Sequence, residues 1–300
     1  MTHTHTPETL VIHHKSCPSG DGFGAAFAAW LALGETAAYL ALDHADQPPC
    51  VAGLDVFILD LSFSVATMER LGREARSLTL LDHHVTGERE LARFKPVCCG
   101  KIHFDLGRSG AVLAWMHFHP EAPIPKLFVH IQDRDLWTWR EPDSKAYLAW
   151  LDSRPKDFAA WRDILAMDPE QTAQALSTGR ALSDQVDRIC AAAAAKSAPI
   201  EIDGRKGLMV NATGEFRSQI GSILAERAGG FGAVWRVAED GRVHVSLRSI
   251  RGCDVEGMAS ARGGGGHPTA ASFSLPPEAL PDLARGWVRS PATVPPSGAA

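Results

Sequence analysis

The stretch Ser77-Leu-Thr-Leu-Leu-Asp-His-His84 decides the fold. Its first five residues form a short apolar run of the kind that makes a buried strand. The run ends abruptly in three ionisable residues, Asp82, His83 and His84. Burying such groups is costly unless they are paired or bind a metal. We therefore interpret the stretch as a strand of a covered sheet that ends at a chemically active edge.

Two similar strands precede this stretch, and helical patterns separate them. Thr9-Leu-Val-Ile-His13 and Val56-Phe-Ile-Leu-Asp60 are compact apolar runs, whereas residues 22–33 and 64–72 have the spacing of helices. Continuous apolar strands that alternate with helices are typical of a parallel sheet covered on both faces. Such sheets bind ligands at the carboxyl ends of their strands, where Asp60 is expected to lie.

The rest of the chain divides into a helical part and a second part that is rich in strands. Helices are expected at residues 109–119 and 125–137, and over most of 145–198. After Pro199, strands are expected at 200–202, 207–211, 232–237, 242–248 and 270–275, with helices at 218–228 and 255–261. The expected fold class is α/β. It comprises a parallel-sheet catalytic domain (1–165), a helical connector (166–198), a smaller mixed α/β domain (199–288) and a disordered tail (289–300).

Composition restricts the class of protein. Of the 300 residues, 45% are hydrophobic and 22% are charged, which excludes a mostly disordered chain and a coiled coil. No apolar stretch approaches the roughly 20 residues that span a bilayer, and Met1–Glu8 lacks the pattern of a signal peptide. The net charge of −5 gives no support for binding long duplex nucleic acid. Six cysteines without a CxxC pair indicate a reduced, cytoplasmic protein.

Acidic and imidazole side chains recur where the strands of the first domain are expected to end. The set comprises His13, His14, Asp21, Asp60, Asp82, His83 and His84, with Asp133 and Asp135 on a later helix. Each carboxylate alone is more often a cap or a surface group, but their joint occurrence indicates a site. Mixed carboxylate and imidazole ligands suit manganese, iron or magnesium. Bridging carboxylates can hold two cations about 3.5–4 Å apart, an arrangement that hydrolyses phosphate esters.

The segment Arg262-Gly-Gly-Gly-Gly-His267 is the second candidate. Glycines let a backbone approach a ligand closely, and consecutive N–H groups can cradle an anion. His267 and Arg248 can both hydrogen-bond a phosphate. A flexible glycine linker is the alternative, but the helical and strand patterns on either side favour a structured loop.

Taken together, these residues resemble the DHH phosphoesterase family, in the subgroup with a C-terminal DHH-associated substrate-binding domain. Leu81-Asp-His-His84 is similar to the motif that names the family, and Gly263–Ala271 is similar to the glycine-rich signature of the associated domain. Asp21–Ala26, Ile58–Asp60 and Ile131–Asp133 resemble the other metal motifs of the family, in the same order. The resemblance covers nearly the whole chain.

The resemblance implies a role for each of these residues. The implied metal ligands are His14, Asp21, Asp60, His83 and Asp133, which would hold two Mn²⁺ ions, with Mg²⁺ or another divalent ion as the alternative. The implied catalytic residues are His84, facing the substrate phosphate, and Asp82, orienting its neighbours. The expected substrate-binding residues are Arg108, Ser109, Arg248, Gly263, Gly264, Gly265, Gly266 and His267.

The first motif leaves a choice open. His13 and His14 are adjacent in a strand and point to opposite faces, so one of them is expected to enter the site. The family usually has an Asp two residues before the position of Asp21, where this chain has Ser19. Cys17 is the alternative occupant of that place.

The function that the resemblance implies is metal-dependent hydrolysis of short oligoribonucleotides (nanoRNA) to nucleoside 5′-monophosphates, in a cleft between the two domains. One alternative substrate is a cyclic dinucleotide or a 3′-phosphoadenosine nucleotide. A second alternative is a nucleotide-binding module with a degenerate metal site. The expected partner is a short RNA or small nucleotide, without long duplex nucleic acid or a membrane, and a homodimer is left open.

Overall fold

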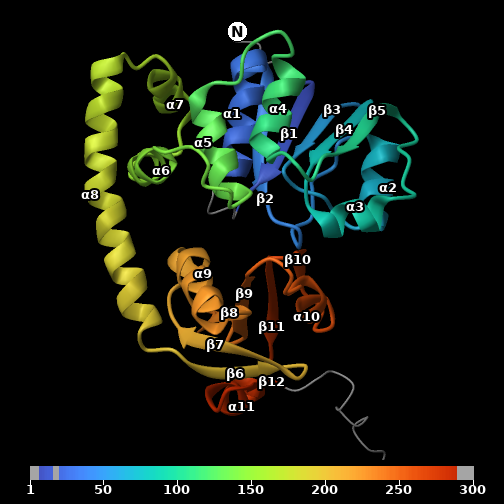
Figure 1. Ribbon diagram of the computed structural model, residues 1–300. Coiled ribbons are helices and arrows are strands. Elements are labelled where there is room, and N and C mark those ends of the chain that lie inside the picture. The colour runs from blue at the N-terminus through green and yellow to red at the C-terminus, as the bar shows by residue number, and fades with distance from the viewer. Residues whose placement is uncertain (1–6, 16–19, 289–300) are drawn as a thin grey trace, which may run out of the picture. The chain divides into compact units, whose positions relative to one another are not determined.

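The computed structural model describes residues 7–15 and 20–288 (Figure 1). The chain forms two units, of which unit 1 ends at Ser183 and unit 2 begins at Asp184. This division falls within the long helix α8 (Pro169–Ala194). The expected tail over 289–300 and the two residues Cys17 and Ser19 lie outside the described residues. Among the helices that are described, none combines the length and apolar character that crossing a membrane requires.

Unit 1 is built on a parallel sheet with the strand order β2-β1-β3-β4-β5. The strands are β1 (Thr9–His14), β2 (Ala37–Leu42), β3 (Asp55–Leu59), β4 (Ser77–Asp82) and β5 (Cys99–Phe104). All four neighbouring pairs are parallel, which confirms the predicted sheet. The sequence predicted the three central strands but not the edge strands β2 and β5, whose residues are mostly half-buried or exposed.

Helices cover both faces of this sheet (Figure 1). Helices α1 (Asp21–Leu33) and α4 (Gly110–Phe118) lie on one face and α2 (Val65–Glu74) on the other. The remaining helices in this part of the chain are α3 (Val85–Leu91), α5 (Lys126–Asp135), α6 (Ser144–Asp152), α7 (Phe158–Leu165) and α8, with the 3₁₀ turn η1 (Gly34–Thr36). Adjacent strand residues enter different cores: Val11 packs with the α1 and α4 side and Ile12 with the α2 side. The predicted helices over 22–33, 64–72, 109–119 and 125–137 are confirmed within a few residues.

Unit 2 contains a mixed sheet in the order β10-β11-β9-β8-β7-β6-β12. Its strands are β6 (Ala198–Ile202), β7 (Arg205–Asn211), β8 (Phe231–Val237), β9 (Val243–Ser249), β10 (Gly265–His267), β11 (Ala270–Leu275) and β12 (Trp287–Val288). Its helices are α9 (Arg217–Ala228), α10 (Glu256–Ser260) and α11 (Leu280–Ala284), with 3₁₀ turns η2 (Gly214–Phe216) and η3 (Pro277–Ala279). The predicted mixed α/β character is therefore confirmed.

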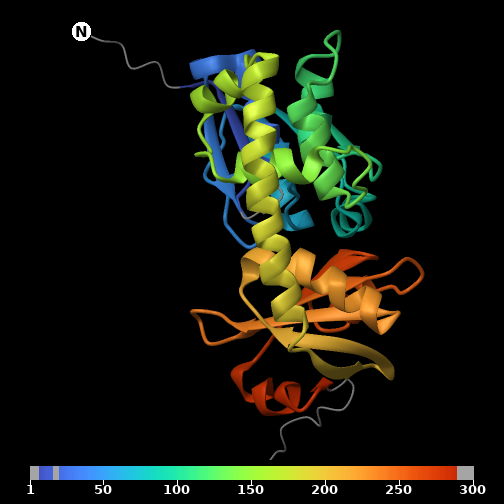
Figure 2. The ribbon, with the colours of Figure 1, turned by 60° about the vertical axis from the view of Figure 1, so that its left-hand side comes forward.

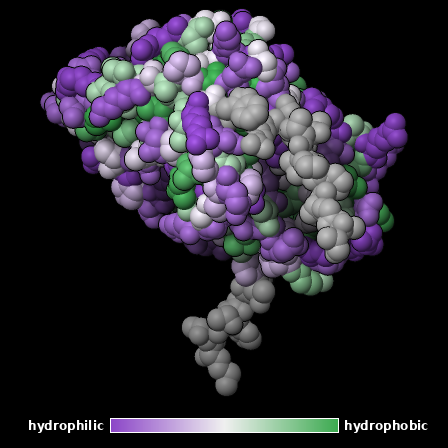
Figure 3. Space-filling model, turned by 90° about the horizontal axis from the view of Figure 1, so that it is seen from below, coloured by the Kyte–Doolittle hydropathy of each residue, from purple (hydrophilic) through white to green (hydrophobic). Residues whose placement is uncertain are grey.

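The two faces of the unit 2 sheet bury separate apolar clusters. Ile220 and Leu224 of α9 pack with Val210 and Val234 of the sheet, and Figure 2 shows α9 lying along this face. The other cluster includes Val245 of β9 and residues of α10, α11 and β11. The face of the molecule seen in Figure 3 is mostly hydrophilic, with apolar side chains scattered over it.

Candidate metal centre

The carboxyl ends of β1, β3 and β4 bring the predicted acidic and imidazole residues side by side. The strand register pairs His13 with Leu59, and Leu59 with Leu81. The next residue of each strand is therefore at the same edge of the sheet, and these residues are His14, Asp60 and Asp82. Parallel strands place their carboxyl ends together, which is why three distant motifs form one cluster.

His83 lies at the centre of this cluster. Its Nε2 is 3.1 Å from Asp60 Oδ1, 3.5 Å from Asp21 Oδ2 and 3.4 Å from Asp135 Oδ2. The side chains of Asp21 and Asp60 are fully buried, and that of Asp135 is 13% exposed. Three carboxylate oxygens thus converge on one imidazole nitrogen, an arrangement that can hold a metal ion.

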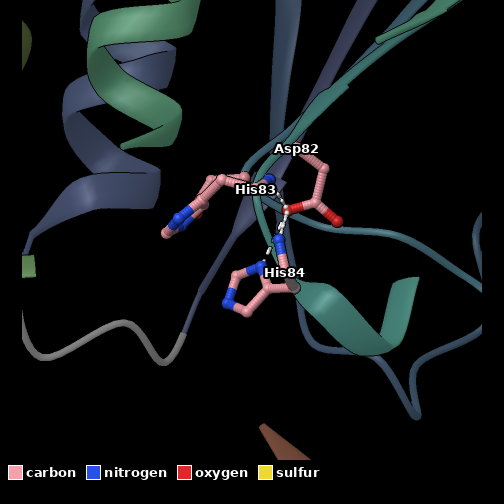
Figure 4. Close-up of side chains that lie close together, drawn as sticks. Asp82, His83 and His84 are labelled. Atoms are coloured by element: carbon pink, nitrogen blue, oxygen red, sulfur yellow. Dashed lines mark hydrogen bonds and ion pairs between the residues drawn. The ribbon is translucent and has the colours of Figure 1, made fainter. Parts of the chain in front are cut away.

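Asp82 holds the two histidines that follow it (Figure 4). Its Oδ1 accepts hydrogen bonds from the backbone N–H of His83 at 2.7 Å and from that of His84 at 3.3 Å, and it lies 2.7 Å from Nδ1 of His84. Figure 4 shows the two imidazole rings pointing in different directions from the end of β4. A carboxylate that bonds an imidazole in this way fixes its tautomer and ring orientation.

The start of α4 fixes the position of the buried carboxylates. Asp21 Oδ2 accepts a hydrogen bond from Gly110 N at 2.6 Å, and its Oδ1 accepts one from Ala111 N at 2.9 Å. Asp60 has a left-handed φ of 58°, which Asp tolerates better than most residues. A Cβ at position 110 would lie 2.4 Å from the Cβ of Asp60, so only glycine lets the helix approach this closely.

The electrostatics of the cluster favour a bound cation. Burial raises the pKa of Asp21, and the charges of Asp60 and Asp135 raise it further. Burial opposes the charged form of His83, but the surrounding carboxylates outweigh it and raise its pKa well above the usual value. Burial also favours protonation of Asp60, yet the adjacent imidazoles His14 and His83 hold its pKa well below the usual range. The raised pKa of Asp21 reflects repulsion between neighbouring carboxylates, which a bound cation would relieve.

Unsatisfied atoms also mark the site as suited to a metal. His14 Nδ1 lies 3.6 Å from Asp60 Oδ2, which is too far for a hydrogen bond. Both atoms are buried, and neither has a hydrogen-bond partner in the described part of the chain. Leaving such atoms unpaired costs about 1–3 kcal/mol each, a cost that a shared cation would remove. Carboxylate oxygens and imidazole nitrogens are the ligands of first-row divalent metals, so the residues fit the implied group.

The structure distinguishes His14 from His13. His14 faces Asp60, whereas the ring of His13 lies edge-on to Phe23 of α1 at 6.4 Å between centroids. Burial lowers the pKa of His13 to about 4, so this imidazole is neutral in the α1 side of the core. Of the two histidines, His14 is the one at the cluster.

Asp133 does not reach the cluster, contrary to the predicted ligand set. Its carboxylate accepts hydrogen bonds from the Thr138 hydroxyl and from two backbone N–H groups of the following loop, at 2.6, 2.7 and 3.0 Å. Asp135 is the carboxylate that reaches His83. Side chains two positions apart on a helix point in nearly opposite directions. The rotation of α5 about its own axis therefore decides whether Asp133 or Asp135 faces the sheet edge.

Sequence reasoning missed two residues beside the cluster, Asp43 and His44. They follow the edge strand β2, whose neighbour in the sheet is β1. Asp43 Oδ1 lies 3.5 Å from His14 Nε2, and the ring of His44 is 5.2 Å from that of His14. The available signal was the run Leu40-Ala-Leu-Asp-His44, a short apolar segment that ends in an acid and an imidazole.

Arg108 and Ser109 take structural positions at the start of α4. Ser109 is buried, its Oγ caps the helix by accepting from Val112 N at 3.4 Å, and its N–H donates to Gln132 Oε1. Arg108 is half exposed, with Nε 3.5 Å from Asp105 Oδ2. The substrate-binding roles expected for these two residues stay predictions.

In unit 2, the glycine segment is an edge strand with its turn rather than an open cradle. Gly263 N and Gly264 N donate to backbone carbonyls of α10 at 3.1 and 3.0 Å, so these N–H groups are already used. Gly265, Gly266 and His267 form β10, which pairs with β11. A Cβ on Gly264 would lie 2.0 Å from Ser272 O, and one on Gly266 would lie 2.4 Å from Ala270 O. Close strand approach therefore explains glycine at these two positions.

We expect Gly264→Ala to destabilise the protein more than Gly263→Ala. At Gly264 the new methyl group meets the backbone of β11, and overpacking of this kind costs about 1–3 kcal/mol or more. Gly263 has open space but a φ of 73°, so alanine there costs only about 1 kcal/mol. Urea unfolding of both variants measures the difference. Equal losses at the two positions would contradict this explanation.

Comparison with known proteins identifies a known domain within unit 2. Residues 210–285 match the DHHA1 domain. This match supports the resemblance to the DHH phosphoesterases. It covers β8, β9, α9 and the glycine segment.

The chain is also similar to three individual proteins. It is 26% identical to the uncharacterized protein R106 of Acanthamoeba polyphaga mimivirus, over 289 residues that cover 89% of this chain and 67% of that protein. Its structure is similar to a pGpG-specific phosphodiesterase, PggH, from Vibrio cholerae, with a TM-score of 0.49, 11% identity and coverage of 92% and 96% of the two chains. The structure of CDC45 from Entamoeba histolytica matches with a TM-score of 0.42, 9% identity and coverage of 93% and 94%.

Proposed function

We propose that this protein is a metal-dependent phosphodiesterase of the DHH phosphoesterase family. The observation that carries the proposal is the convergence of the Asp21, Asp60 and Asp135 carboxylates on Nε2 of His83. The match of residues 210–285 to the DHHA1 domain supports it independently. Buried carboxylates that bridge cations are the usual protein contribution to phosphate ester hydrolysis.

The site would contain residues that bind the metal ions and residues that contact the substrate phosphate. The residues that would hold the divalent ions are His14, Asp21, Asp60, His83 and Asp135. Such ions, when bound, polarise a phosphoryl oxygen and lower the pKa of a bound water. His84 would donate a hydrogen bond to the phosphate, because Asp82 outweighs the effect of burial and raises the pKa of this imidazole. Asp82 would keep the ring of His84 in place during this contact.

We further propose short oligoribonucleotides as substrates, with nucleoside 5′-monophosphates as products. A net charge of −5 suits a small anchored substrate better than a long nucleic acid. Cyclic dinucleotides and 3′-phosphoadenosine nucleotides carry the same phosphate chemistry and remain the alternative substrates. Mn²⁺ is the ion that we propose, because nitrogen and oxygen ligands occur together.

Arg248 is the residue of unit 2 that we propose to bind the substrate phosphate. Its Nη1 donates to Leu247 O and its Nη2 to Ser218 Oγ, both at 2.7 Å. Burial, and then the neighbouring Arg217, lower its pKa to about 10, which still leaves the guanidinium charged at neutral pH. Two neighbouring cations make this a favourable place for an anion.

We expect Arg248→Ala to raise KM about 10-fold or more with little change in kcat, because it removes binding that substrate and transition state share. Steady-state kinetics on a dinucleotide measures both constants. Arg242→Ala is the matched control, because this arginine is exposed and its Nη2 donates to the backbone carbonyl oxygen of Ser274. An unchanged KM for the Arg248 variant would count against its anchoring role.

The experiment that tests the function is a product time course with Mn²⁺. Labelled RNAs of two to about twenty nucleotides, a cyclic dinucleotide and adenosine 3′,5′-bisphosphate are incubated in parallel, with and without EDTA. Rapid, EDTA-sensitive conversion of the shortest RNAs to mononucleotides supports the proposal. Cleavage of only a small nucleotide keeps the chemistry and changes the substrate. No cleavage by metal-loaded protein would overturn the proposal and favour a nucleotide-binding module.

A further inference from the structure

Three imidazole rings from three strand ends lie together beside the carboxylate cluster. The ring centroids of His14 and His44 are 5.2 Å apart, those of His14 and His84 are 5.9 Å apart, and those of His44 and His84 are 5.8 Å apart. With metal–nitrogen distances of about 2.0–2.1 Å, imidazole centroids around one tetrahedral ion lie about 5 Å apart. The His14 and His44 rings have this spacing.

An oxygen acceptor lies on one side of each of the first two rings. His44 Nδ1 is 2.9 Å from the carbonyl oxygen of Ser62, and His14 Nε2 is 3.5 Å from Asp43 Oδ1. Because a carbonyl oxygen only accepts, His44 must carry its proton on Nδ1. The lone pair of the neutral ring is then on Nε2. Metal-binding histidines typically have such an oxygen on the nitrogen that does not bind the metal.

The other nitrogen of His14 supplies the second half of the site. His14 Nδ1 faces Asp60 Oδ2 at 3.6 Å, and both buried atoms lack a hydrogen-bond partner in the described ranges 7–15 and 20–288. His44 is exposed to solvent, so it stands where an ion can enter. The His14 ring therefore faces Asp60 through Nδ1, and the His44 ring lies beside it with a free lone pair on Nε2.

We propose that His44 is a metal ligand, which binds together with His14 and Asp60 the cation at the β2 side of the cluster. Asp43 is the positioning residue of this site, because it lies at the Nε2 of His14. The inference rests on the proposed function, since it concerns the same metal centre. His84 borders the same space and would contact a phosphate bound to that cation.

The two cation positions then differ in chemistry. The position at His83 is rich in carboxylates, with Asp21, Asp60 and Asp135 around one imidazole. The position at His14 and His44 contains two nitrogen ligands. Nitrogen ligands favour Mn²⁺, Co²⁺ or Zn²⁺ over Mg²⁺. The position near His44 should therefore discriminate more strongly against Mg²⁺.

Calorimetric titration of the full chain with Mn²⁺ and with Mg²⁺ tests this assignment. We expect two binding steps for Mn²⁺ in the wild type, and about 10-fold or greater weakening of one step in His44→Ala. The absorption spectrum of the Co²⁺-loaded protein should change in the same variant, because a nitrogen ligand is lost. His117→Ala is the matched control, because this imidazole at the end of α4 contacts Phe57 and lies outside the cluster.

Asp43→Asn is the second variant, since it alters the orientation of His14 without removing a ligand. It should weaken the same step less than His44→Ala does, and thermal unfolding of each variant confirms that the chain is folded. Mn²⁺ binding that is unchanged in both variants would overturn the inference and leave the proposed function intact. A folded wild type that binds no divalent ion would overturn the proposed function as well.

Discussion

Asp60→Asn is expected to lower kcat by about 10³-fold or more, because the pre-organised charge that it removes is worth several kcal/mol in a transition state. Asp60 Oδ1 lies 3.1 Å from His83 Nε2, and its Oδ2 faces His14 Nδ1. It is thus the residue best placed to serve both cation positions. Asparagine has the same shape and tolerates the φ of 58°, so the fold should survive the change.

The measurement is the rate of product release at saturating substrate, together with the Mn²⁺ content of the protein. Asp163→Asn removes an exposed carboxylate from α7 in the same unit and should leave both quantities unchanged. Turnover by Asp60→Asn within 10-fold of the wild type, in protein of verified metal content, would contradict a mechanism that uses this cluster.

The second large effect separates the two acids of α5. Asp135→Asn is expected to lower kcat about 10²-fold or more and to weaken Mn²⁺ binding, because its carboxylate lies 3.4 Å from His83 Nε2. Asp133→Asn should instead destabilise the fold by about 1–3 kcal/mol, because an amide N–H₂ would face hydrogen-bond donors of the loop. The two variants carry the same chemical change at neighbouring positions, so each is the control of the other.

Kinetics, Mn²⁺ titration and urea unfolding of both variants decide between the two assignments. If Asp133→Asn lost metal affinity while Asp135→Asn kept it, the original expectation from the sequence would be right and the rotation of α5 described above would be wrong. If both lost metal affinity to the same degree, the loop held by Asp133 would itself be required at the centre.

The sequence was sufficient to predict an element or a site residue wherever a local pattern is compatible with only one structural environment. Continuous apolar runs indicated the central strands β1, β3 and β4, because strands buried on both faces need apolar side chains throughout. The helices expected over 64–72 and 109–119 begin at Ser64 and Ser109, and in the structure both of these residues cap a helix. Asp60 and His83 were predicted at the site, because polar residues directly after such strands lie at the ligand-binding edge of a parallel sheet.

The same reasoning failed at the edges of the sheet. Strand β5 (Cys99–Phe104) mixes polar and apolar residues, so its sequence lacks the apolar run that indicates a central strand. Strand β2 (Ala37–Leu42) is apolar, but half of its residues are alanine, which favours helices over strands. Asp43 and His44 were missed for this reason, because a residue is recognised at a strand end only when the strand itself is recognised.

What the sequence by itself determined is the fold class and the kinds of side chain at the carboxyl edge of the first sheet. Tertiary structure alone decided which member of each local pair takes part: His14 rather than His13, and Asp135 rather than Asp133. Tertiary structure also decided that Gly264 and Gly266 are glycines because the backbone of β11 lies too close for a side chain. The physical reason is direction, because the side of a strand or helix that a residue faces depends on the packing of the whole element.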